Sequence, residues 1–476
     1  MQRVGWWILF FAVTQASACA EEPAARPAAA ASSAQAAPGE GSDWPAFLGP
    51  TADSKSPETG ILTKWPAEGP PLLWKLELGT GYCMPTISEG RLFQFDRVDD
   101  LERLRCLDAR TGKQHWEFTY ESQFEDLYGY DNGPRSSPVV DGDRVYTFGA
   151  EGMLHCLNTV DGKVCWKLDT ADKFGVIQNF FGVGSTPVVE NDLLIVMVGG
   201  SPPESKSVPP GQLDRVVGNG TGIVAFDKMT GEVKYAITDQ LASYATPKLA
   251  TIDGRRWCFV FARGGLVGFE PASGKVDFEF PWRASLLESV NASDPVVVGN
   301  RVLISETYGP GAALLEVRPG QEPEVVWSDA ERRRDKSLQT HWNTPVYVDG
   351  YVYASSGRHT ENAELRCVEF DTGKVIWSQP DLTRSSLLYV DGHFVCLSED
   401  GTLRLVRANP NKYDPVAEVV LQDRPPTEPN PFDFKPPRLL RYPAWAAPIL
   451  SQGLLYVRGV DRLVCLELIP GSRSAQ

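Results

Sequence analysis

Hydrophobic and polar positions alternate along most of the chain, in short runs separated by Gly, Pro, Asn and Asp. The clearest stretch is 137–166, SPVVDGDRVYTFGAEGMLHCLNTVDGKVCW. It divides into four runs separated by two D-G turns and one short loop, and the last run ends in Trp166. A period of two is typical of strands, whereas a helix would repeat its apolar residues every three or four positions. The pattern predicts an all-β structure made of four-stranded units.

The four-strand unit recurs eight times. Each copy opens on a small residue followed by Pro, at positions 85, 138, 187, 247, 295, 345 and 448, and Leu387 takes the Pro position in a degenerate seventh copy. Neighbouring positions are 42 to 61 residues apart. Four-stranded repeats of roughly 40 to 50 residues are the signature of propeller blades. We therefore expect an eight-bladed β-propeller.

The two ends of the repeat region complement each other. The eighth copy stops at its third run, LVCLEL, and lacks an outer strand. A matching run, PPLLWKLEL, precedes the first copy. We expect the strand 71–78 to join the last blade, which closes the ring and leaves no unpaired edge. The single propeller domain is predicted to span 43–470.

Large aromatic residues occupy one position of the outer run in most copies. Gly112 supplies the positive φ that the preceding turn needs, as in LRCLDARTGKQHW. We expect the aromatic ring to pack against the next blade, where it would bury about 150–250 Å². The tryptophans at this position are Trp74, Trp116, Trp166, Trp327 and Trp377.

The cysteines follow the repeat. Cys106, Cys156, Cys367 and Cys465 occupy the same position in different copies, too far apart to bridge, and are predicted to be small buried apolar residues. The sequence leaves one disulfide open, between Cys156 and Cys165 across a hairpin, although cross-strand neighbours strain such a bond.

The motif C/A-L-D-x-x-T-G-K-x-x-W resembles the tryptophan-docking repeat of the PQQ-type (quinoprotein-like) β-propeller family, and the resemblance extends from Asp43 to Leu468. The segments DWPAFLGP and YDNGPRSSPVV are similar to those of a bacterial exported subgroup. The resemblance implies one of two functions. The family contains PQQ-dependent alcohol and sugar dehydrogenases, and also non-enzymatic members such as the lipoprotein scaffold of the outer-membrane β-barrel assembly machinery.

The dehydrogenases of that family have an adjacent Cys–Cys disulfide, a calcium site of Glu, Asn and Asp, and an Asp base. This sequence has no adjacent Cys pair, no C-x-x-C-H haem motif and no convincing Glu/Asn/Asp trio at matching positions. We therefore expect a ligand-binding or protein-interaction scaffold at the cell envelope. The alternative is a PQQ-dependent alcohol or sugar dehydrogenase, in which Arg135, Asn291, Asp294 and His341 would hold the quinone. PQQ and calcium are expected only under this alternative.

A ligand site is predicted at one mouth of the central channel. The residues just before each innermost strand should surround that mouth, and several are polar or aromatic where a plain connection would not require it. Two arginines could clamp a carboxylate and a Trp could stack on a planar ring, which suits a small anionic ligand. The competing interpretation is that these side chains only bind water and satisfy strand ends. The candidates are Tyr82, Asp131, Asn132, Arg135, Tyr244, Asn291, Asp294, His341, Trp342, Arg384 and Trp445.

Charge and the terminal segments bear on location and partners. The formal net charge of −15 argues against a nucleic-acid partner. Arg3 and the short apolar run VGWWILFFAV predict a signal peptide, 1–20, with either cleavage after Ala20 or lipid attachment at Cys19. An Ala/Pro-rich linker, 21–42, follows, and 471–476 forms a tail. The protein is thus expected in the periplasm or envelope, bound to an envelope protein or a small anion, without a transmembrane span.

Two Pro-rich insertions interrupt the blades, 201–220 and 423–443. Loops longer than a blade requires often cover a channel mouth or contact a partner, and otherwise lack order.

Overall fold

The computed structural model describes residues 1, 41–209, 211–423 and 437–471. Nearly all of the predicted signal peptide and linker, including Cys19, lies outside these ranges, as do the centre of the 423–443 insertion and the tail after residue 471. The chain separates into two units, Met1–Ala34 and Gln35–Gln476. The strands and helices of the described residues belong to the second unit.

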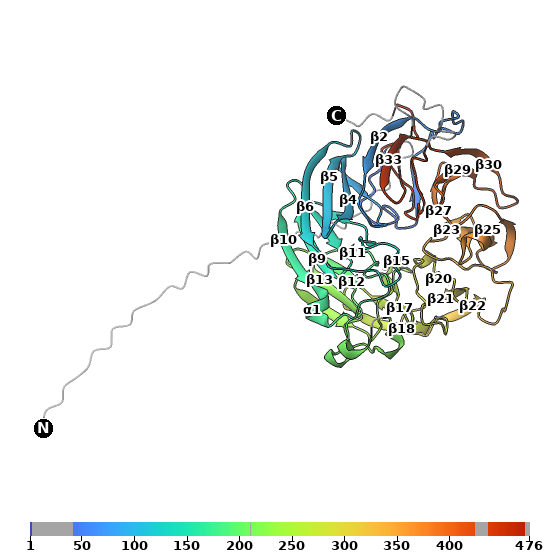
Figure 1. The fold of residues 1–476 in the computed structure, drawn as a ribbon. Coiled ribbons are helices and arrows are strands. Elements are labelled where there is room, and N and C mark those ends of the chain that lie inside the picture. The colour runs from blue at the N-terminus through green and yellow to red at the C-terminus, as the bar shows by residue number, and fades with distance from the viewer. Residues whose placement is uncertain (2–40, 210, 424–436, 472–476) are drawn as a thin grey trace. The chain divides into compact units, whose positions relative to one another are not determined.

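Eight antiparallel sheets follow one another around a ring in the order of the sequence (Figure 1). Blades 1 to 4 contain β3 (Thr86–Ser88), β4 (Arg91–Val98), β5 (Leu101–Asp108), β6 (Gln114–Glu121); β7 (Val139–Asp141), β8 (Arg144–Phe148), β9 (Met153–Asn158), β10 (Val164–Asp169); β11 (Val188–Glu190), β12 (Leu193–Met197), β13 (Ile223–Asp227), β14 (Val233–Ile237); and β15 (Lys248–Ile252), β16 (Arg255–Phe261), β17 (Gly265–Glu270), β18 (Lys275–Pro281).

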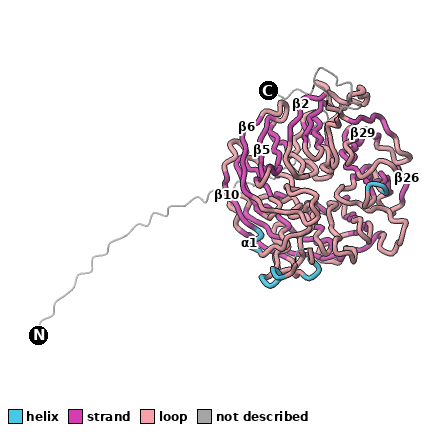
Figure 2. Tube along the Cα trace, viewed as in Figure 1, coloured by secondary structure: helices cyan, strands magenta, loops and turns pink. Residues whose placement is uncertain are grey.

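Blades 5 to 8 contain β19 (Val296–Val298), β20 (Arg301–Ser305), β21 (Ala312–Glu316), β22 (Glu324–Ser328); β23 (Val346–Val348), β24 (Tyr351–Ser356), β25 (Glu364–Glu369), β26 (Val375–Gln379); β27 (Ser385–Val390), β28 (His393–Ser398), β29 (Thr402–Arg407), β30 (Pro415–Val420); and β31 (Ile449–Ser451), β32 (Leu454–Arg458), β33 (Arg462–Glu467) with β2 (Leu72–Glu77). In the part of the chain that the structure describes, helical structure is limited to α1 (Thr170–Phe174) and the 3-10 turns η1 (Pro203–Ser207), η2 (Leu213–Arg215) and η3 (Thr360–Asn362) (Figure 2).

The ring closes as predicted. Strand β2 pairs antiparallel with β33, with Trp74 opposite Cys465, so the blue and red ends of the ribbon meet in one sheet (Figure 1). The prediction of an eight-bladed all-β propeller is confirmed. One detail differs: β1 (Lys55–Ser56) adds a short parallel strand to β27, so blade 7 has five strands rather than four.

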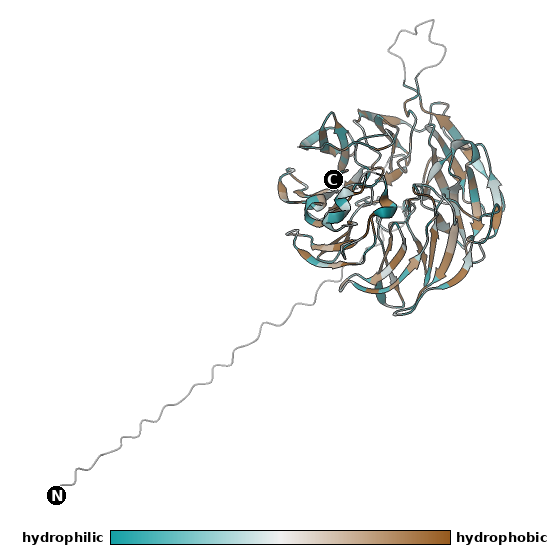
Figure 3. Cartoon of the chain, turned by 60° about the horizontal axis from the view of Figure 1, so that its bottom comes forward, coloured by the Kyte–Doolittle hydropathy of each residue, from teal (hydrophilic) through white to brown (hydrophobic). Residues whose placement is uncertain are grey.

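Burial follows the position of each strand within its blade. In blade 1 the second strand, β4, is buried over most of its length, whereas the outermost strand, β6, alternates between partly buried and exposed residues. Hydrophobic colour accordingly concentrates on the strands (Figure 3). Neighbouring sheets pack face to face, and this apolar contact between blades is the main source of stability.

Each of the five outer-strand tryptophans contacts the following blade. In four of the five cases the ring lies against the turn glycine of that blade; the turn that faces Trp377 has no glycine. A Cβ added to Gly162 would stand 2.6 Å from the Trp116 ring. Glycine is therefore required there both for its φ of +69° and for its missing side chain. The indole Nε1 donates a hydrogen bond to a carbonyl of the following blade in the pairs Trp74–Ala109, Trp116–Thr159, Trp166–Lys228, Trp327–Phe370 and Trp377–Asn409.

The position before each inner Pro has a similar role near the channel. The Met84 N–H of blade 1 donates to Ser137 Oγ of blade 2 at 3.0 Å, and the Ser137 N–H donates to Thr186 Oγ1 of blade 3 at 3.1 Å. The series continues through Thr246, Asp294 and Thr344. A short side-chain acceptor at this position thus links each of blades 2 to 6 to the blade before it.

Eight cysteines lie in the described residues, and all are free thiols, Cys156 and Cys165 included. Seven are buried, and the exposed one is Cys165. The bridge that the sequence left open does not form.

The segment preceding β1 runs across the ring, which the repeat pattern does not indicate. Trp44 bridges to Ile87 in blade 1, and the Pro45 carbonyl accepts from Val140 in blade 2. The Thr51 carbonyl accepts from Lys248 Nζ of blade 4, and β1 pairs with blade 7. One short stretch of chain therefore touches four blades and crosses the central channel.

Candidate functional site

A cavity of about 460 Å³ lies at one mouth of the channel. Phe47, Leu48 and Ser54 of the crossing segment form part of its lining. Its other lining residues come from the connections between blades and from the loops between second and third strands. Of the eleven predicted site residues, seven line this cavity: Tyr82, Arg135, Tyr244, His341, Trp342, Arg384 and Trp445. Their role in ligand binding stays a prediction.

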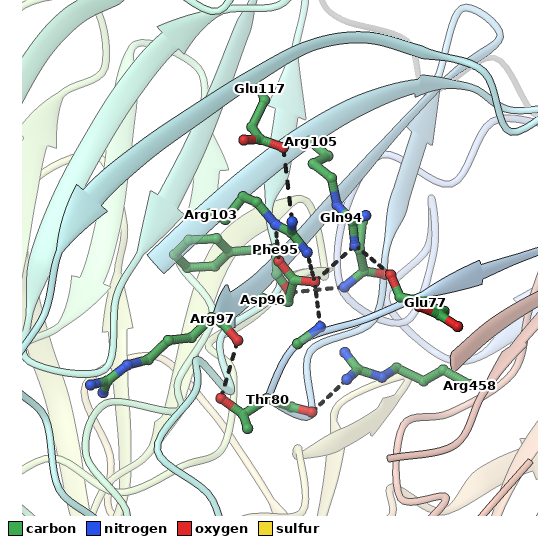
Figure 4. A network of polar contacts seen from close by, with 12 residues as sticks. Glu77, Thr80, Gln94, Phe95, Asp96, Arg97, Arg103, Arg105, Glu117 and Arg458 are labelled. Carbon is green, nitrogen blue, oxygen red and sulfur yellow. Dashed lines mark hydrogen bonds and ion pairs between the residues drawn. The ribbon is translucent and has the colours of Figure 1, made fainter. Parts of the chain in front are cut away.

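A buried polar network fixes the segment that carries Tyr82 (Figure 4). Asp96 is fully buried and accepts hydrogen bonds from Arg103, Arg105 and the Gly79 N–H, at 2.8–2.9 Å. Arg458 of blade 8 donates to the carbonyls of Gly81 and Cys83, at 2.5 and 2.7 Å. Because four charged side chains and several backbone groups satisfy one another here, the backbone on both sides of Tyr82 is held in place.

The cavity wall is largely aromatic. Trp445 lies at its centre, with ring centroids 4.8 Å from Tyr82, 4.9 Å from Trp342 and 6.2 Å from Tyr130. Further rings extend the wall on both sides through Phe181, Tyr128, Tyr244, His341 and Tyr308. Such a surface can bury a planar or apolar group and offers few polar groups to orient it.

The two arginines predicted to clamp a ligand are engaged by carboxylates of the protein. Arg135 Nη2 lies 2.6 Å from Asp126 Oδ2, and its guanidinium also stacks over Tyr82. Arg384 makes a bidentate pair with the buried Glu399, which also accepts from Trp445 Nε1 at 3.0 Å. These pairs hold the rings of the wall in position, which differs from the predicted clamp on a ligand carboxylate.

His341 is neutral. Burial, with the nearby Arg384 and Arg358 cations, lowers its pKa to about 3. Its Nδ1 lies 3.3 Å from Arg384 Nη1, which can only donate, so Nδ1 is the acceptor and the ring proton is on Nε2. Nε2 lies 3.1 Å from the hydroxyl of Tyr308, whose pKa burial raises to about 12. His341 therefore orients Tyr308 and is unsuited to act as a base near neutral pH.

The four remaining predicted residues serve the backbone. Asp131 accepts from the Gly133 N–H and Asn132 from the Asp126 N–H, which shapes their turn. Asn291 donates to the carbonyls of Ala262 and Trp282. None of these four residues lines the cavity.

Asp294 is buried and accepts from the Thr246 N–H at 2.7 Å. The four residues assigned to a quinone therefore do not form one site, since Arg135 and His341 line the cavity and Asn291 and Asp294 are turned into backbone contacts. Within the described residues, no group of three or more His, Cys, Asp or Glu side chains could hold a metal ion. The four residues assigned under the dehydrogenase alternative therefore do not fit the quinone as one binding set.

Two important lining residues escaped the sequence prediction. Tyr308 follows β20 and Arg358 follows β24, in loops between second and third strands. Antiparallel strands alternate in direction, so these loops open on the same face as the connections between blades. A search of both loop classes would have found them. Phe47 and Leu48 had no comparable signal, because their place depends on the path of the crossing segment.

The 201–220 insertion supports the cavity from behind. Leu213 and Val216 are buried with Phe180, and Phe181, Tyr244 and Tyr308 pack against that cluster. Asp214 pairs with Arg263 and Arg283 of the neighbouring blade, at 2.9 and 2.6 Å. The insertion, whose order the sequence left open, is structured apart from residue 210, which is outside the description.

Helices able to cross a membrane, judged by length and hydropathy, do not occur in the described ranges.

Comparisons with known proteins agree with this architecture. The family model described as outer membrane protein assembly factor BamB matches residues 101–341. The outer membrane protein assembly factor BamB of Yersinia pestis is 21% identical over 356 residues, which is 72% of this chain and 80% of that protein.

Solved structures show the same fold. BamB from Moraxella catarrhalis aligns with a TM-score of 0.53 and 12% identity, over 83% of this chain and 97% of that one. The quinohemoprotein alcohol dehydrogenase of Comamonas testosteroni aligns with a TM-score of 0.60 and 13% identity, over 90% of this chain and 81% of that one.

Proposed function

The chain belongs to the family of the outer membrane protein assembly factor BamB, and from this premise we propose that it is an exported scaffold that binds a partner polypeptide of the cell envelope at the cavity mouth. The signal peptide predicted over 1–20 supports export, and Cys19 with the linker 21–42 would provide a lipid tether. We propose that the partner takes part in outer-membrane protein assembly, as the name of the relative from Yersinia pestis indicates for that protein.

The observation that carries the proposal is the exposure of three tyrosine rings at the mouth. Tyr128, Tyr130 and Tyr442 are 49%, 61% and 56% exposed. They contact the buried wall directly, since Tyr130 and Tyr442 both lie against Trp445 and Tyr128 lies against Phe181. Tyrosines of this kind offer large contact areas with little conformational entropy to lose, and they are enriched at protein interfaces.

Dehydrogenase activity is not carried over from the structural relative. A likeness at 13% identity concerns the fold, and the residues that would hold the quinone do not form one site. The geometry favours a recognition surface, because two of its three arginines, Arg135 and Arg384, are paired with carboxylates of the protein and its histidine is neutral.

The proposal is tested by placing a photo-crosslinking amino acid at Tyr130 or Tyr442 of the full-length protein in its native host. Matched control positions are Val164 and Val233, exposed on the outer strands β10 and β14. We expect crosslinks to an outer-membrane assembly protein from the two mouth positions and not from the controls. Equal crosslinking from the controls, or adducts from the mouth only with proteins outside the envelope, would refute the proposal.

Export and anchoring have a separate readout. Cell fractionation should find the wild type in the envelope, and Cys19→Ser should release it to the soluble periplasmic fraction if Cys19 carries lipid. Recovery of the wild type in the cytoplasmic fraction would contradict the proposal.

A further inference from the structure

Arg358 is the cavity arginine without a carboxylate partner among the described residues. Three arginines line the cavity, and the other two are paired with Asp126 and Glu399. The Arg358 guanidinium lies over the Tyr308 ring, with its carbon 4.6 Å from the ring centroid. An arginine side chain carries five N–H donors and remains charged at any ordinary pH. This charge is partly buried, and none of the described carboxylates is in contact with it, although the buried Glu306 lies close enough to interact with it electrostatically.

Tyr308 offers a second donor beside it. The Tyr308 hydroxyl accepts from His341 Nε2, because Nδ1 of that ring is already the acceptor for Arg384. The hydroxyl proton is therefore available to a further acceptor, and the raised pKa keeps it in place near neutral pH. Two hydrogen-bond donors, one of them cationic, thus stand together in an aromatic cavity.

The charges around the cavity differ between its interior and its rim. Glu288 and Glu361 also line it, but both are exposed. Glu306 lies behind the cavity, where the backbone N–H groups of Tyr308 and Gly309 bind its carboxylate at 2.6 and 2.8 Å. The interior therefore favours an anion, and the rim favours neighbouring cations.

We propose that this cavity receives an acidic side chain of the partner polypeptide, flanked by aromatic residues, with the carboxylate bound by Arg358 and the Tyr308 hydroxyl. The inference rests on the proposed function and specifies the chemistry of its partner. The flanking rings contact Trp342 and Trp445, and basic residues farther along the segment face Glu288 and Glu361. A charge-assisted pair in such a site is strong because few water molecules compete with it.

The test uses the pentapeptide acetyl-Lys-Phe-Asp-Phe-Lys-amide and its Asn counterpart as probes. The full-length protein is labelled with 5-fluorotryptophan, and the ¹⁹F signals of the two cavity tryptophans are assigned with Trp342→Phe and Trp445→Phe. We expect the Asp peptide to shift both signals at millimolar concentration or below, and the Asn peptide to bind roughly tenfold to a hundredfold more weakly.

Arg358→Gln should bring the Asp peptide down to the affinity of the Asn peptide. Arg358 makes no ion pair with a described residue, so this variant removes only its contact with the Tyr308 ring and should fold like the wild type. Arg333→Gln is the matched control, because Arg333 is exposed in the 329–337 loop outside the cavity and its removal should change nothing.

Each other result has a defined meaning. Equal binding of the Asp and Asn peptides at the cavity would overturn the carboxylate inference and leave the polypeptide-binding function standing. The absence of any shift with either peptide would also overturn it, while the crosslinking experiment would still decide the proposed function. If N-acetylphenylalanine as the free acid bound as tightly as the Asp peptide, the site would belong to small carboxylates, which would also refute the inference.

Discussion

The contact between blades can be tested at one glycine. Gly162 has a φ of +69°, and a Cβ there would stand 2.6 Å from Cε3 and 2.8 Å from Cδ2 of the Trp116 ring. The ring cannot move away freely, since its Nε1 is bonded to the Thr159 carbonyl and it packs against Phe93. Gly162→Ala should therefore add an overpacking cost to the backbone cost of a positive φ.

A control variant in the same blade separates the backbone cost from the overpacking cost. Gly142 has a φ of +55° and open space around its Cβ position. Gly142→Ala should cost only the backbone term, about 1 kcal/mol. Gly162→Ala should cost that plus about 1–3 kcal/mol of overpacking, or about 2–4 kcal/mol in all.

Equilibrium urea unfolding, followed by far-ultraviolet circular dichroism, measures both variants. A double-mutant cycle with Trp116→Leu then isolates the contact, because a smaller side chain leaves room for the Cβ. In that background the extra cost of Gly162→Ala should disappear. Equal losses for the two glycine variants, or strict additivity in the cycle, would refute the assigned role of the Trp116–Gly162 contact.

Two further predictions concern buried carboxylates. Burial raises the pKa of Asp294 to about 7, outweighing the Thr246 N–H and the Lys248 charge, so the folded state holds a proton that the unfolded state releases near pH 4. The stability this group contributes is therefore present at low pH and lost as the pH rises through 7. Asp294→Asn should remove that pH dependence. If the difference in unfolding free energy between the wild type and the variant were the same at pH 5 and pH 8, this prediction would be wrong. Glu399→Gln should cost about 3 kcal/mol by leaving Arg384 without its buried partner, whereas Glu418→Gln, at an Arg–Glu pair whose carboxylate is 60% exposed, should cost less than about 1 kcal/mol. If thermal unfolding showed similar losses of stability for these two variants, the buried Arg384–Glu399 pair would contribute no more than the exposed pair.

The fold was predictable because its determinants are local and repeated. Most copies carry their own turn residues, an inner Pro and an outer aromatic residue, and the unmatched strand 71–78 indicates closure. The crossing segment around Trp44 was not predictable, since it occurs once and its contacts lie in four different blades.

The site was predictable in position and less so in detail. Repeat register placed Trp342 and Trp445 at the mouth, where the structure has them. Register does not show which way a polar side chain turns: Val290 and Ala292 line the cavity, whereas Asn291 between them bonds backbone carbonyls. Register also does not show which charged side chains form ion pairs. The sequence prediction therefore included Arg384, which is bound to Glu399, and missed Arg358, which has no carboxylate partner among the described residues.

The most direct test of the central claim is hydroxyl-radical footprinting of the protein in native envelopes and after purification. Tyr130 and Tyr442 at the mouth are the reporters, and Met229, 47% exposed in the turn between β13 and β14, is the internal reference. If the mouth binds a partner, both tyrosines are oxidised in the purified protein and protected in the envelope, while Met229 reacts equally in both. Equal oxidation of the tyrosines in the two samples, or protection at Met229 instead, would contradict the account.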